Sequence, residues 1–112
     1  MKSILGLLFG LLIFLNQGHA QTGDSLRQEA DHFFKQKDWN NAAKLYQQLT
    51  AQTPNDNNAW FRLGIALHSQ QKFSEAIPAF EKAESLTHAP TVMYNLACAN
   101  ARAGNKDRAF SW

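Results

Sequence analysis

Cysteine is scarce in this sequence: Cys98 is the only one among 112 residues. A single cysteine cannot form an internal disulfide, so the domain has to be held together by packing. The sequence also lacks a large excess of charge of one sign. It has 11 basic and 9 acidic residues, and neither kind forms a run. Nucleic-acid binding needs a basic stripe or patch. We therefore expect no nucleic-acid partner.

Motifs for catalysis are missing as well. The sequence contains no Gly-x-Ser-x-Gly elbow, no phosphate-binding glycine loop and no His-Glu-x-x-His motif. His32, His68 and His88 do not have the spacing of metal ligands, and we interpret them as surface residues. We expect no catalytic residue, no metal and no cofactor, and we interpret the chain as a protein that is not an enzyme.

Long apolar runs are limited to residues 4–15, which follow the basic Lys2. Twelve residues are too few for a membrane-spanning helix, which needs about 20. Small residues precede a candidate cleavage site after Ala20, as in a secretory signal peptide. We expect residues 1–20 to be a signal peptide and residues 21–112 to be exported, into a bacterial periplasm or the medium, without a membrane span. The alternative is an uncleaved membrane anchor.

The rest of the sequence repeats at an interval of about 34 residues. Ala42 and Ala76 are 34 residues apart, and so are Tyr46 and Phe80. A fixed period of this length indicates stacked units of similar structure. Apolar residues recur at intervals of three and four in two stretches of each unit, which predicts two helices. The predicted units are residues 23–56, 57–89 and an incomplete 90–112.

Local signals predict how the helices begin and where they meet. Ser25 and Ser74 are the predicted N-caps of two helices. Pro78 is expected in or near the first turn of its helix, where a missing N–H costs least. A small residue lies midway along the first helix of each unit, where helix axes are expected to approach most closely. These residues are Ala30, Gly64 and Ala97.

The pattern resembles the tetratricopeptide repeat. The second unit carries that family's motif in order and spacing: Trp60-x-x-Leu63-Gly64, then Ala76, Phe80 and Ala83. The resemblance implies an all-α fold, an α-solenoid of antiparallel helix pairs with two full repeats and a partial third. The sequence departs from the motif at His88, which stands where a closing proline is expected. The interval from the second unit to the third is one residue shorter than the interval from the first to the second, which predicts a tighter turn between the second and third units.

The resemblance also implies a function. Members of this family bind a peptide or a partner protein in a concave groove lined by the first helix of each unit. Carried over to this sequence, the groove residues are Arg27, Asp31, Phe34, Asn58, Phe61, Ile65, His68, Tyr94, Cys98 and Arg102. The chain is thus expected to be a non-catalytic scaffold for a protein or peptide partner.

Family members that hold a terminal carboxylate use lysine and asparagine side chains. Here Asp31 stands where the asparagine would be, and Phe61 and Tyr94 stand where lysines would be. A mixed, largely apolar groove is expected instead of a carboxylate clamp. For Phe34 and Ile65 the alternative role is packing against the neighbouring unit.

The third unit lacks most of its second helix, and we expect the natural chain to continue beyond Trp112. The alternative is a short product whose last turn frays. Two other functions stay open at this point. The repeats could form the N-terminal module of a longer enzyme with its catalytic domain beyond residue 112. The open third unit could instead associate with a second copy.

Overall fold

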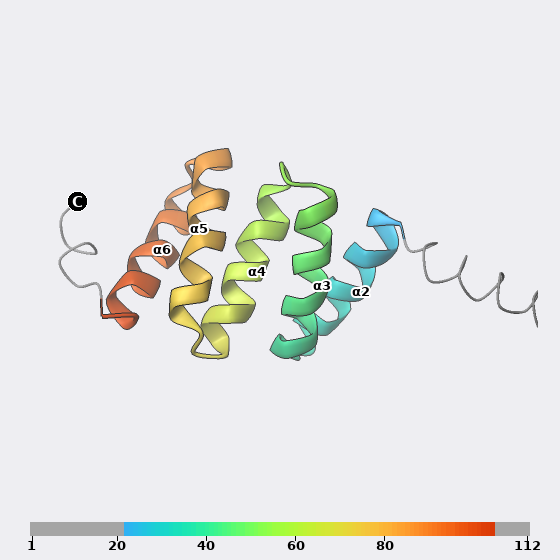
Figure 1. Cartoon of the computed structure of the whole chain (residues 1–112), viewed down its shortest axis with the longest axis horizontal. Coiled ribbons are helices and arrows are strands. Elements are labelled where there is room, and N and C mark those ends of the chain that lie inside the picture. The colour runs from blue at the N-terminus through green and yellow to red at the C-terminus, as the bar shows by residue number, and fades with distance from the viewer. Residues whose placement is uncertain (1–21, 105–112) are drawn as a thin grey trace, which may run out of the picture.

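The computed structural model describes residues 22–104, which form five helices and no strand. They are α2 (Gly23–Lys35), α3 (Trp39–Gln52), α4 (Asn57–Ser69), α5 (Phe73–Thr87) and α6 (Pro90–Arg102). Figure 1 shows them side by side in chain order. Each helix packs against the next, and α6 also contacts α4. The predicted all-α solenoid of helix pairs is confirmed.

Two of the predicted features fall on residues at the chain ends. The expected signal peptide and the second helix of the third unit lie outside the described residues. Among the helices of residues 22–104, none has the length and apolar character to cross a membrane.

Short polar side chains begin three of the helices. Thr22 is the N-cap of α2, and its hydroxyl accepts a hydrogen bond of 3.2 Å from the Ser25 amide. Asp38 and Asp56 cap α3 and α4 in the same way, through the amides three residues further on. The prediction that Ser25 is the cap is wrong. Its amide is one of the first-turn donors that need an external acceptor, and Thr22 supplies it.

Helix α5 begins one residue before the predicted cap. It starts at Phe73, and Lys72 occupies the N-cap position without a side-chain hydrogen bond, so the assignment of Ser74 is wrong. Pro78 therefore lies inside the helix, beyond its first turn. Because proline has no N–H, the carbonyl of Ser74 lacks the donor that residue 78 would otherwise supply.

The turns between the two helices of the first and second units each contain one residue in the left-handed region. These residues are Lys37 and Gln71, with φ angles of 60° and 62°, and Gly104 after α6 has a φ angle of 87°. The link between units differs instead. Residues 53–56 join α3 to α4, whereas residues 88–89 suffice between α5 and α6, where His88 is left-handed. The predicted tighter turn is confirmed.

Large and small side chains alternate in the core. Tyr46 and Phe80 are fully buried, and so are Ala30 and Ala76. A Cβ atom on Gly64 would lie 2.5 Å from the Phe80 ring, so this ring of α5 packs directly on the backbone of α4 at that glycine. The corresponding Ala97 of the third unit is only half-buried in the described structure.

Candidate functional site

The ten predicted groove residues lie on α2, α4 and α6, the first helices of the three units. Ion pairs join α2 to α4 and its N-cap, and α4 contacts α6 directly. The three helices therefore form one row, with α3 and α5 packed between successive members. Residues three or four apart on a helix share one of its faces. We call the face of this row that carries the ten predicted groove residues the first-helix face.

The junction of α2 with α4 is built around Asp31. Its carboxylate accepts hydrogen bonds from the hydroxyl of Tyr46 and from Arg62, the latter at 2.8 Å. The Arg62 guanidinium also lies 5.1 Å from the centre of the Phe34 ring. That ring meets Trp39 and Tyr46 edge-on, at 5.3 and 6.0 Å. Asp31 and Phe34 thus hold the first two units together, the alternative role stated above for Phe34.

The same contacts fix the protonation states at this junction. Burial raises the pKa of Tyr46 well above its ordinary value, and although Arg62 opposes the rise, the hydrogen bond to Asp31 adds to it. The hydrogen bond with Tyr46 raises the pKa of Arg62, against the opposing effect of burial. The phenol therefore stays a hydrogen-bond donor, and the guanidinium stays charged.

A second ion pair closes the junction at the start of α4. Arg27 binds Asp56, whose carboxylate also caps α4 through the Ala59 amide at 3.1 Å. Burial raises the pKa of Asp56, but the hydrogen bonds from Arg27 and Ala59 outweigh it and lower the pKa overall. Arg27 is thereby engaged within the fold.

The junction of α4 with α5 and α6 is aromatic. The His68 ring lies 4.9 Å from that of Phe73, with their planes at 75°, and 6.4 Å from that of Phe80. Phe61 lies 6.0 Å from Phe80, and Arg102 places its guanidinium 6.0 Å from the centre of the Phe73 ring. These side chains form one cluster along α4, from Phe61 to His68.

His68 is half-buried, so its interpretation as a surface residue holds only in part. Its Nδ1 atom is buried and has no hydrogen-bond partner in the described structure. Burial lowers the pKa of His68, and the positive charge of Arg102 lowers it further. His32 and His88 are exposed, as expected. Within residues 22–104 no three histidine, cysteine or acidic side chains are grouped so that they could hold a metal ion.

The remaining predicted residues differ in exposure. Tyr94 on α6 is 70% exposed, and the adjacent Met93 is 41% exposed. Asn58 is also exposed, whereas Ile65 and Cys98 are half-buried. Tyr94 and Met93 thus leave a large apolar surface in contact with solvent on the third unit.

Arg62 and Met93 were not among the predicted site residues. Arg62 lies 31 residues after its partner Asp31, three fewer than the repeat length. The separation of 31 residues equals one repeat of 34 residues minus about one helical turn. Opposite charges at this separation on neighbouring first helices are the sequence signal that could have predicted the pair. Met93 occupies the position of Trp60 in the preceding unit, and the repeat alignment could have identified it.

Comparisons with known proteins agree with this architecture. The sequence pattern described as tetratricopeptide repeat matches residues 27–90. A structure of the MamA D159K mutant superposes with a TM-score of 0.79 at 22% identity, covering 85% of this chain and 53% of that one. The TPR2B domain of yeast Sti1, in a complex with pHsp70, superposes with a TM-score of 0.69 at 25% identity, covering 78% of this chain and 70% of that one.

A curated human protein also matches part of the sequence. Aspartyl/asparaginyl beta-hydroxylase is 34% identical in a match of 79 residues, with a coverage of 67% of this chain and 10% of the hydroxylase. The chain therefore spans about a tenth of that relative. Since the family pattern covers more than half of the sequence, this chain belongs to the tetratricopeptide repeat family.

Proposed function

We propose that this chain is a non-catalytic interaction module that holds a segment of a partner protein along its first-helix face. One observation carries the proposal: the Tyr94 ring is 70% exposed on a helix whose opposite side is buried. Exposed apolar side chains that gather on one face are typical of a contact surface. Phe61 occupies the matching position of the preceding unit, so two aromatic rings follow one another along the row.

The chemistry of the first-helix face favours an apolar segment. Arg27 and Asp31 are paired within the fold, so the first unit offers few free polar groups. A terminal carboxylate would find Arg27 and Arg62 already paired with Asp56 and Asp31, which disfavours a carboxylate clamp. Apolar anchor residues that pack on Phe61 and Tyr94 would suit this face better.

The complex of the Sti1 domain supports this use of the fold. That domain was solved with pHsp70 and resembles this chain at 25% identity. A protein or peptide is therefore the partner class that we propose, without a named partner. We also propose that the module acts after export, on the strength of the signal-like pattern in residues 1–20.

The test uses Tyr94→Ala in the full chain. Peptides would first be selected on the wild-type protein from a random displayed library, and their affinities then measured by fluorescence anisotropy. Because Tyr94 is mostly exposed, its truncation should leave the circular dichroism spectrum unchanged and weaken binding about tenfold or more. Phe61→Ala should act in the same direction.

The matched control is Lys44→Ala, an exposed position on α3 outside the first-helix face. This variant should bind like the wild type. Equal affinity of the Tyr94→Ala and wild-type proteins would refute the assignment of the first-helix face.

A second candidate function rests on the hydroxylase match. The repeats could be a module of a longer enzyme, since the matched segment is only 10% of that relative. Reading the coding DNA past the codon for Trp112 tests this alternative. A continuing frame with a catalytic motif would favour the enzyme module, and further repeats would favour the scaffold.

A further inference from the structure

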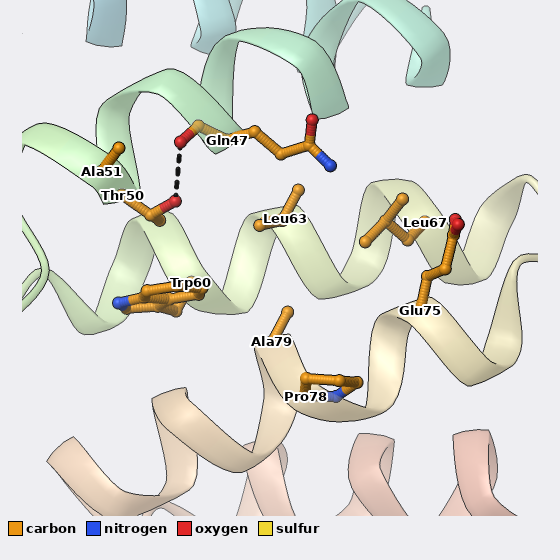
Figure 2. A pocket seen from close by; sticks show the side chains of 9 residues that line it. All are labelled: Gln47, Thr50, Ala51, Trp60, Leu63, Leu67, Glu75, Pro78 and Ala79. Carbon is orange, nitrogen blue, oxygen red and sulfur yellow. Dashed lines mark hydrogen bonds between the residues drawn. The ribbon is translucent and has the colours of Figure 1, made fainter.

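A hollow of about 480 Å³ opens on the other side of the molecule, between α3 and α5 with α4 as its floor. Figure 2 shows Trp60, Leu63 and Leu67 of α4 along its base. Residues two apart on a helix point to nearly opposite sides. Leu63 therefore points away from Phe61 and Ile65, and none of the ten predicted groove residues lines this hollow.

The floor of the hollow is apolar and rigid. The indole nitrogen of Trp60 donates a 2.8 Å hydrogen bond to the carbonyl of Pro54, which fixes the ring. Leu63 and Leu67 are buried core residues, and Pro78 and Ala79 of α5 form an apolar wall of the hollow. These surfaces can pack against the aliphatic part of a ligand.

The rim supplies hydrogen-bond acceptors and negative charge. Glu75 is the one charged residue of the lining, which contains no lysine or arginine. Figure 2 shows Glu75 of α5 and Gln47 of α3 extending from opposite sides toward the space above Leu67. The hydroxyl of Thr50 is already used, because it donates to the carbonyl of Gln47 at 3.0 Å.

We propose that this hollow binds a lysine or arginine side chain presented by a partner protein. The aliphatic stem would pack on Trp60 and Leu63, and the cation would meet the Glu75 carboxylate. A volume of about 480 Å³ lies in the range of ligand sites and admits the residues flanking the basic one. Because this surface and the first-helix face point in opposite directions, the module could hold two segments at once.

The test is a nuclear magnetic resonance titration of the ¹⁵N-labelled full chain with acetyl-Leu-Arg-Leu-amide. The control peptide carries citrulline, which keeps the shape of arginine without its charge. We expect the arginine peptide to shift the indole signal of Trp60 and the amides of Gln47 and Glu75. The citrulline peptide should bind at least fivefold more weakly.

A pair of matched variants tests the role of the Glu75 charge. Glu75→Gln should reduce affinity for the arginine peptide at least fivefold, whereas Asp24→Asn makes the same charge change in the first turn of α2 and should not.

Equal affinity for the arginine and citrulline peptides would overturn this proposal, as would shifts confined to α2 and α6. The outcome does not depend on the first-helix face, because Tyr94→Ala should leave this affinity unchanged. Failure here and failure of the proposed function are therefore distinguishable.

Discussion

Replacing Gly64 with alanine would place a methyl group inside the contact between α4 and α5. The new carbon would lie 2.5 Å from Cδ1 and Cε1 of Phe80 and 2.9 Å from Cζ. Carbon atoms pack best at about 3.5–4.0 Å, so the ring or a helix would have to move by about 1 Å. Phe80 is fully buried and its ring contacts Phe61 and His68, which leaves it little room.

Two opposing effects set the size of the change. Alanine favours a helix over glycine by about 1 kcal/mol. Overpacking a filled core costs about 1–3 kcal/mol, and the tight geometry at Phe80 places this site at the upper end. We therefore expect Gly64→Ala to lower the free energy of unfolding by about 1–2 kcal/mol. For a domain of this size that lowers Tm by roughly 5–15 °C.

The measurement is urea unfolding of the full chain, followed by circular dichroism at the helix band. Gly23→Ala is the control, because its Cβ would meet only the Gln52 side chain, at 3.9 Å. That variant should differ from the wild type by less than about 0.5 kcal/mol. If Gly64→Ala were as stable as the wild type, the close approach of α4 and α5 would be disproved.

Two further predictions concern the junctions between units. Arg62→Met should destabilise the fold by about 1–2 kcal/mol, because it leaves the half-buried Asp31 carboxylate without its cation, and urea unfolding that matches the wild type would contradict this. The lowered pKa of His68 means that the unfolded chain binds a proton at this residue more tightly than the folded chain does. The contribution of neutral His68 to the free energy of unfolding should therefore be fully present above about pH 6.5 and be lost as the pH falls through the lower pKa of the folded state. His68→Gln should flatten that decline, and Arg102→Gln should raise the pKa of His68 measured by nuclear magnetic resonance; an unchanged pKa would refute the influence of Arg102.

The 34-residue period predicted the helix pairs because each pair buries the same pattern of large and small side chains. Ala76 and Phe80 recur in step with Ala42 and Tyr46, and all four are buried. The helix starts were harder to predict from cap chemistry. Trp39 and Phe73 each begin a helix two residues after a left-handed turn residue, so the turn rather than Ser74 determines the start of α5.

The candidate site was less predictable than the fold because it depends on contacts between helices. Helical spacing placed His68 on the first-helix face, but only the packing of Phe73 and Phe80 shows that its Nδ1 atom is buried. The pairing of Asp31 with Arg62 likewise needs the offset between neighbouring helices. The hollow draws on three helices at once, so no single periodicity reveals it. Partner binding by the ten first-helix residues stays a prediction.

The left-handed turn residues offer a way to separate folding from binding. Lys37 and Gln71 adopt a backbone conformation that costs a residue with a side chain about 1–2 kcal/mol, whereas Gly104 adopts it freely. Glycine at either exposed turn should recover part of that strain, less the entropy that glycine adds to the unfolded chain. Such a second-site substitution could compensate a destabilised variant without altering the first-helix face or the hollow. A binding defect that persists after this compensation would belong to the surface and not to the fold.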